Sequence, residues 1–217
     1  MKRALAGTMG LVSLSTVWLG PLQALAPGPF AAHMLMHMGV VAVAAPLLAL
    51  AVAGSSFDPV PRAPGVFVAI PASLAELFAV WGWHAPTLHH AARHTTGGLL
   101  LEQATFLVSG LWVWLAALGG DARAGGTRAG MGMVALLLTS MHMTLLGALI
   151  ALAPRPLYVH AHAHAAHGAG LSPLEDQQIG GAIMLLAGGA AYLAGGLWLG
   201  ALILGRRGVL APSGSRP

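Results

Sequence analysis

Residues 33–38 read His-Met-Leu-Met-His-Met and open a long apolar segment of the chain. In a helix, His33 and His37 are four residues apart and lie one above the other on the same face. The thioethers beside them belong to Met34, Met36 and Met38. Imidazole nitrogen suits copper and zinc, and thioether sulfur selects Cu(I). We interpret this stretch as a metal site, against the alternative that methionine fills gaps in apolar packing and interfacial histidine is merely solvated.

The composition of the chain is that of an integral membrane protein. Hydrophobic residues make up 57% of the 217 residues and charged residues 7%, whereas a soluble domain carries about 25% charged residues. Low aromatic content and the lack of long strand-like alternation argue against an outer-membrane barrel. The chain has no Cys, which leaves His, Met, Asp and Glu as the available ligands. The basic residues are scattered, so the net charge of +4 does not indicate binding to nucleic acid.

Six apolar segments approach the length of about 20 residues that a membrane-spanning helix needs. These predicted spans cover about residues 4–19, 30–53, 66–83, 98–118, 130–152 and 179–204. The first and third are shorter, and the third contains Pro71 and Glu76. The prediction is a single integral membrane domain over residues 1–217, an all-α polytopic transmembrane helix bundle of about six spans.

The first 26 residues allow two interpretations. A basic start, an apolar middle and a possible cleavage site at Ala24–Ala26 are typical of a signal peptide. However, Pro27 would follow the cut, and the apolar stretch is long for a signal. We expect a retained span.

The basic residues predict the orientation of the spans. If the N-terminus is cytoplasmic, eight of the ten Lys and Arg residues fall in cytoplasmic segments, and only Arg93 and Arg155 fall outside. This positive-inside bias predicts that both termini are cytoplasmic. Ten of the eleven histidines then lie at or near the outer face, and only His142 lies deep in a span. This sidedness is the strongest functional signal in the residue pattern itself.

Four further polar residues could belong to a site near His33. His84 follows the interfacial tryptophans of the third span and should lie at about the level of His33. His142 should lie about 15 Å inside the fifth span, as a deeper ligand, a relay step or an interhelical hydrogen bond. Glu76 and Glu102 are intramembrane carboxylates, which burial keeps neutral unless a cation or metal is close. Glu102, about one turn below the surface, could complete the site or pair with a histidine.

The predicted outer loop, residues 153–178, is rich in histidine. It contains His160, His162, His164 and His167. Such a tract can collect metal weakly, although a low-complexity insertion explains it equally well. Asp176 and Gln177 open the sixth span, where an aspartate is a good N-terminal capping residue. We expect His89 and His90, in the preceding outer loop, to be solvated.

Four segments of the chain share features with one known family. They are GPLQALAPGPFAAHMLMHMGVVAVAAPLLAL (Gly20–Leu50), WHAPTLHHAARH (Trp83–His94), LEQATFLVSGLWVW (Leu101–Trp114), and LLGALIALAPRPLY followed by SPLEDQQIGGAIM (Leu145–Met184). In this order and as a set they resemble the multi-pass CtaG family of cytochrome c oxidase assembly proteins.

The resemblance implies a non-enzymatic protein of the bacterial plasma (inner) membrane that assists copper insertion into a haem-copper oxidase. Its implied partners are cytochrome c oxidase subunits or other copper chaperones, within the lipid bilayer. The matching positions point to His33, His37 and His84, with Asp176 and Gln177 as motif residues of unknown role. Three departures stand out: Gln103 replaces a histidine that many members have, the chain lacks an extra span of longer members, and its His-rich loop is not a general feature.

Our hypothesis is that His33, His37 and His84 hold Cu(I) with a nearby methionine in a shallow, open site. Few and soft ligands would let the ion leave for a stronger site on the client. One alternative is a membrane b-type cytochrome with bis-His haem, in which His37 pairs with His142 or His84. Others are a metal-cation transporter that uses Glu76 and His142, and an assembly scaffold without a ligand. We find no nucleophile with a base and no phosphate-binding glycine motif, so no enzyme is predicted.

Overall fold

The computed structural model describes residues 1–120, 126–158 and 171–210. The first long segment is α1 (Lys2–Leu19), followed by the short α2 (Leu22–Leu25). The second consists of α3 (Pro29–Met38), the π-helical η1 (Gly39–Ala44) and α4 (Ala45–Val52). Then come α5 (Ala69–Trp83), the short α6 (Pro86–His94), α7 (Thr96–Leu118) and α8 (Thr127–Ala151). The last segment consists of α9 (Pro173–Ile183), the π-helical η3 (Met184–Gly188) and α10 (Gly189–Leu210).

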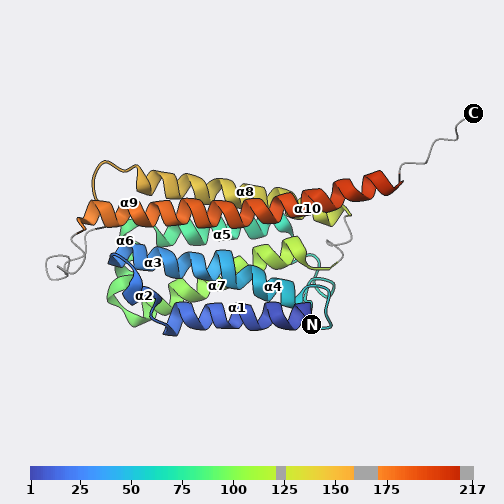
Figure 1. Ribbon diagram of the computed structural model, residues 1–217, viewed down its shortest axis with the longest axis horizontal. Helices are drawn as coiled ribbons and strands as arrows, with labels where there is room; N and C mark the ends of the chain where they lie inside the picture. The colour runs from blue at the N-terminus through green and yellow to red at the C-terminus, as the bar shows by residue number, and fades with distance from the viewer. Residues whose placement is uncertain (121–125, 159–170, 211–217) are drawn as a thin grey trace, which may run out of the picture.

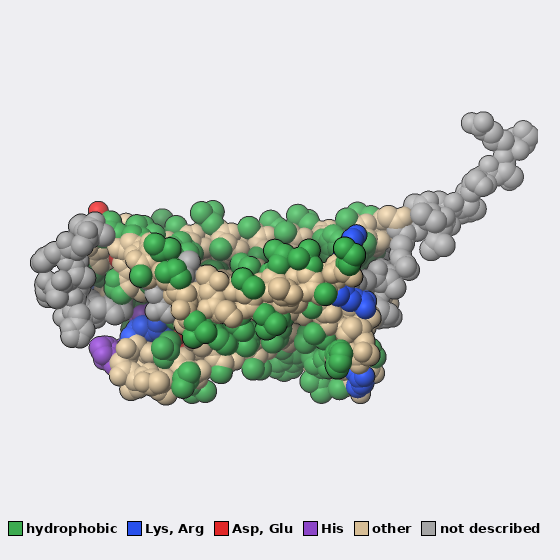
Figure 2. Space-filling model, turned by 60° about the horizontal axis from the view of Figure 1, so that its bottom comes forward, with side chains coloured by type: hydrophobic (Ala, Val, Ile, Leu, Met, Phe, Trp, Pro, Cys, Tyr) green, Lys and Arg blue, Asp and Glu red, His purple; other side chains and the backbone are tan. Residues whose placement is uncertain are grey.

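The long helices run side by side along one axis and form a single bundle (Figure 1). This confirms the predicted all-α fold, and all regular secondary structure in the described ranges is helical. Within the part of the chain that the structure describes, four segments are long and apolar enough to cross a membrane, namely Pro29–Val52, Thr96–Leu118, Thr127–Ala151 and Pro173–Gly205. The apolar α5 is shorter, at 15 residues. Hydrophobic side chains also cover the outside of the bundle along its length (Figure 2), as a lipid environment requires.

Small residues allow the helices to approach closely, as they do in membrane bundles. A Cβ atom added at Gly147 of α8 would lie 2.6 Å from the backbone nitrogen of Leu185. One added at Gly181 of α9 would lie 2.5 Å from the backbone nitrogen of Ala151. On the other side of the bundle, α1 packs on α4, where a Cβ at Gly10 would lie 2.9 Å from Leu48. These contacts hold the helices at backbone-to-backbone distance and so limit how far the site residues can move.

The two ends of the bundle differ in charge. Most of the visible Lys and Arg side chains lie toward one end, and the visible histidine lies at the other (Figure 2). We call the second the histidine end: α3, α6, α7 and α9 begin there, and α5 and α8 end there (Figure 1). The N-terminus of α1 lies at the opposite, arginine end (Figure 1).

Asp58 ties the loops together at the arginine end. Its carboxylate accepts backbone N–H groups from Gly54 at 2.6 Å, Val60 at 3.0 Å and Gly120 at 2.8 Å. Burial alone would raise the pKa of Asp58, but these three donors and the nearby Arg128 hold it below its usual value. Gly54 and Gly120 have φ values of +68° and +61°, which glycine adopts without strain.

We predict that Asp58→Asn destabilises the protein by about 1–3 kcal/mol at neutral pH, because an amide offers the three donors fewer acceptor sites. The folded-state pKa is the lower one, so the contribution of the carboxylate is present above its unfolded pKa of about 3.9. It is lost as the pH falls through the folded value. Thermal unfolding of the detergent-solubilised protein across this range checks both statements. An equal difference between Asp58→Asn and wild type at every pH would contradict the prediction.

Candidate metal centre

His33 and His37 lie on one face of α3, as their spacing predicts. Pro29 begins this helix at a position where its missing N–H is not needed. The two imidazole rings are nearly parallel, at 10°, with centroids 6.3 Å apart. Both side chains are fully buried. None of their four ring nitrogens has a hydrogen bond, so the pair is a set of buried, unsatisfied ligand atoms.

His84 joins this pair from the end of α5, as expected. Its ring centroid lies 5.4 Å from that of His33 and 5.3 Å from that of His37. Its Nδ1 lies 2.6 Å from the Val80 carbonyl oxygen. A carbonyl only accepts, so the hydrogen must be on Nδ1, which leaves the Nε2 lone pair for a metal. Nε2 has no hydrogen bond. We call His33, His37 and His84 the inner triad.

His89 was expected to be solvated, and this was wrong. Residues 86–94 form the short helix α6, which turns His89 and Ala92 inward and leaves His90 exposed. His89 is 3% exposed, and its ring lies edge-on to that of His33 with centroids 4.8 Å apart. Pro86 at the start of the helix and the three-residue spacing of His89 and Ala92 were the signals in the sequence.

Glu102 reaches His33 from α7. Its Oε2 lies 3.7 Å from Nδ1 of His33, and the carboxylate is fully buried. The same oxygen accepts hydrogen bonds from Arg93 and, at 3.1 Å, from Nε2 of Gln103. His33, His89 and Glu102 each offer one potential ligand atom, and these three atoms lie within 4.8 Å of one another. We call these three residues the terminal triad, because it lies nearer the end of the bundle than the inner triad.

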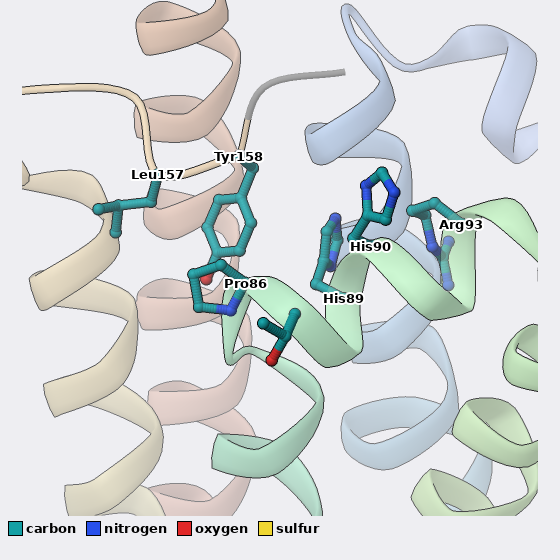
Figure 3. A pocket seen from close by; sticks show the side chains of 7 residues that line it. Pro86, His89, His90, Arg93, Leu157 and Tyr158 are labelled. Atoms are coloured by element: carbon teal, nitrogen blue, oxygen red, sulfur yellow. The ribbon is translucent and has the colours of Figure 1, made fainter. Parts of the chain in front are cut away.

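A cavity of about 470 Å³ lies beside the terminal triad at the histidine end (Figure 3). Its lining includes Pro86, His89, His90, Arg93, Leu157 and Tyr158. In Figure 3 the Tyr158 ring faces His89 across this space, and their centroids are 4.7 Å apart. The cavity therefore offers a small solute a way to His89 from the end of the bundle.

Tyr158 also supports His84. Its hydroxyl donates to the His84 carbonyl oxygen at 2.7 Å. Burial raises the pKa of Tyr158 to about 12, so the hydroxyl keeps its proton and remains a donor. The ring stacks on Phe30 of α3 with centroids 4.3 Å apart. One side chain thus contacts the elements that carry all four histidines of the two triads.

The methionines of α3 are buried, but two of them face the last helical segment. A Cβ at Gly180 of α9 would lie 3.1 Å from Met34 Cγ, and one at Gly188 would lie 3.3 Å from Met38 Sδ. Met36 is 4% exposed. A ligand role for any of the three stays a prediction.

His142 lies deeper in the bundle, on α8. It is buried, neither ring nitrogen has a hydrogen bond, and it interacts electrostatically with His37. No ring contact joins His142 to the inner triad among the described residues, so its role as a deeper ligand stays a prediction. Glu76 belongs to a different network, in which the Tyr192 hydroxyl bonds to its carboxylate and also lies 3.3 Å from the Val41 carbonyl oxygen.

Asp176 caps α3, not the helix that contains it. Its two carboxylate oxygens accept the N–H groups of Phe30 at 2.8 Å and Ala31 at 2.9 Å. At the start of α9 itself, Ser172 and Glu175 form the capping box. A Cβ at Gly28 would lie 2.3 Å from the Asp176 carboxylate, so this contact requires glycine there. Asp176 therefore sets the position of the first turn of α3, one turn before His33.

Gln177 and Gln103 hold two other parts of the site. Gln177 accepts the Leu157 N–H at 2.6 Å and donates to the Ile150 carbonyl at 3.1 Å, which fixes the segment before Tyr158. Gln103 accepts from the Trp18 indole at 3.0 Å and donates to Glu102, which links α1 to the terminal triad. Gln103 thus bonds directly to a candidate ligand, whereas Gln177 acts on the backbone next to Tyr158. The tract with His160, His162, His164 and His167 lies outside the described residues.

We predict that Asp176→Ala destabilises the protein by about 1–3 kcal/mol, because two buried N–H groups lose a charged acceptor. Asp176→Asn should recover part of this loss, since its amide oxygen can still accept. Thermal unfolding in detergent measures both. The neighbouring Glu175→Ala is the comparison, because it removes the capping box of α9 with Ser172 and leaves the cap of α3 in place. Equal losses at residues 175 and 176 would argue against a special role for the α3 cap.

The chain matches the family described as cytochrome c oxidase caa3 assembly factor over residues 1–204. The comparisons with curated proteins and with solved structures give no match. The family match covers α1 to α9 and most of α10, and with them every described histidine and carboxylate of the two triads. This chain therefore belongs to the cytochrome c oxidase caa3 assembly factor family.

Proposed function

We propose that this protein binds copper at the inner triad and assists its insertion into a haem-copper oxidase. Membership of the family places it in the assembly of cytochrome c oxidase. The binding of copper, the side of the membrane and the transfer step are our proposal. The protein acts as an assembly factor and not as an enzyme, with oxidase subunits or other copper chaperones as its partners.

The convergence of three buried imidazoles is the observation that carries this proposal. His33, His37 and His84 have centroids 5.3 to 6.3 Å apart, and five of their six ring nitrogens have no hydrogen bond. A buried polar atom without a partner costs free energy. Among the described residues, ligand atoms that all lie within 4.8 Å of one another are found for His33, His89 and Glu102, and not for the inner triad. A metal ion bound by one nitrogen of each inner-triad ring would therefore draw the three rings closer together.

The chemistry of the ligands favours Cu(I). The inner triad contains only neutral nitrogen donors, and the chain has no Cys, so a thiolate zinc or iron–sulfur site is excluded. Met36 on the same helix is a soft thioether that could add to the preference for Cu(I), whereas Met34 and Met38 face the last helical segment. Neutral ligands do not cancel the charge of the ion, which suits a protein that must release it to a client.

The charge asymmetry supports delivery on the outer face. Arg62 and Arg128 bond to the loops at the arginine end, where Arg3 also lies close to Gly54. The positive-inside rule then places the arginine end in the cytoplasm. The histidine end and its cavity face outward, where copper delivered from outside would reach His89 first.

We expect the detergent-purified protein to hold a single Cu(I) tightly. His37→Ala should lower its Cu(I) affinity by at least about tenfold, because loss of a ligand costs more than loss of a group that orients one. In cells, the same variant should lower the copper content and the activity of the oxidase. His94→Ala, at an exposed histidine on α6, is the control.

The contrary outcomes are distinct. Normal oxidase copper content with His33, His37 and His84 all replaced would reject a copper role for the inner triad. Impaired assembly together with no copper binding by the wild-type protein would instead favour a scaffold. A Soret band in the purified protein would favour the haem alternative.

A further inference from the structure

The two triads share His33 but differ in the class of ligand that they offer. The inner triad is made of three imidazoles. The terminal triad combines two imidazoles with the buried carboxylate of Glu102. Carboxylate and imidazole together suit a borderline divalent ion such as Zn²⁺ or Co²⁺, whereas Cu(I) gains little from a carboxylate.

Arg93 forms an ion pair with Glu102 in the structure and so balances its negative charge. Its guanidinium bonds to Oε2, the oxygen that also faces Nδ1 of His33. The Arg93 side chain is 17% exposed and belongs to the lining of the cavity, whereas the carboxylate is fully buried. Arg93 can therefore move toward solvent while Glu102 stays in place. A divalent ion at the carboxylate would repel the guanidinium and replace it as the counter-charge.

His33 cannot serve both triads at once. A neutral imidazole has one nitrogen with a hydrogen and one with a lone pair. Nδ1 of His33 faces Glu102 at 3.7 Å, so an ion in the terminal triad takes the lone pair on that side. The other nitrogen then carries the hydrogen and is lost as a ligand to the inner triad.

We propose that the terminal triad, His33, His89 and Glu102, is a second metal position that binds a borderline divalent cation and excludes Cu(I) from the inner triad. Arg93 holds the carboxylate when this position is empty. A divalent ion bound there blocks copper loading by removing His33 from the inner triad. The binding of the divalent ion stands by itself, and the block on loading rests on the proposed function.

Co²⁺ is the probe, because its visible absorption reports the ligands around it. We expect the purified full-length protein to bind Co²⁺ with a nitrogen and oxygen ligand spectrum, and Zn²⁺ to displace it. His89→Ala should lose this signal and keep Cu(I) binding. His37→Ala should keep the Co²⁺ signal and weaken Cu(I) binding. The matched control His94→Ala should keep both. Cu(I) added first should prevent Co²⁺ binding.

Variants of the ion pair test the role of Arg93. Arg93→Gln should raise the affinity for Co²⁺ by about tenfold, because the ion no longer displaces a charge-assisted hydrogen bond. Glu102→Gln should abolish Co²⁺ binding. If that variant fails to fold because Arg93 loses its partner, the double variant Arg93→Gln/Glu102→Gln removes both charges and should fold without binding Co²⁺.

Each failure has its own signature. No Co²⁺ binding, a Co²⁺ signal unchanged in His89→Ala, or simultaneous binding of Co²⁺ and Cu(I) overturns the inference. If Cu(I) binding then still depends on His37, the proposed function stands. The protein could instead bind Co²⁺ in a way that depends on His89 and show no affinity for Cu(I). That result overturns the proposed function and the block on copper loading, and it leaves the divalent position in place.

Discussion

The position of the candidate metal centre depends on the carboxylate of Asp176 at the start of α3. The first N–H groups of a helix have no partner within it, and in lipid each unsatisfied group is costly. Asp176 satisfies two of them from α9, a segment 146 residues away in sequence from Phe30. The same contact brings the last long segment against the second and fixes the height of His33 and His37.

The second constraint is the concentration of polar atoms in an apolar bundle. Glu102 and the imidazoles of the two triads are packed among Phe30, Phe106 and Tyr158, and the His37 ring lies 4.0 Å from that of Phe106. Groups of this kind are retained inside a membrane protein mainly where they have a function. Stability alone would favour apolar residues at these positions, so a role in binding accounts for them better than a role in folding.

Below the triads, the π-helical η1 opens the backbone of the second segment. The Val41 carbonyl accepts the Trp114 indole at 3.0 Å and lies 3.3 Å from the Tyr192 hydroxyl. Irregular turns of this type leave backbone groups available to side chains and occur often near functional sites. These contacts join α7 and α10 to η1, which continues the helix that carries His33 and His37.

Local periodicity in the sequence determined the apolar helices, the shared face of His33 and His37, and the place of His84 and Glu102 near one end of the bundle. These follow from spacing of a few residues and from apolar length, which act within one segment. Local spacing indicates which face of α6 carries His89, but tertiary structure decided that this face is buried against His33. Tertiary structure alone decided that Arg93 bonds to Glu102, that Asp176 caps α3, and that Met34 and Met38 face the last segment. The physical reason is that each of these outcomes depends on which helix packs beside which, and on close backbone contacts between segments distant in the chain.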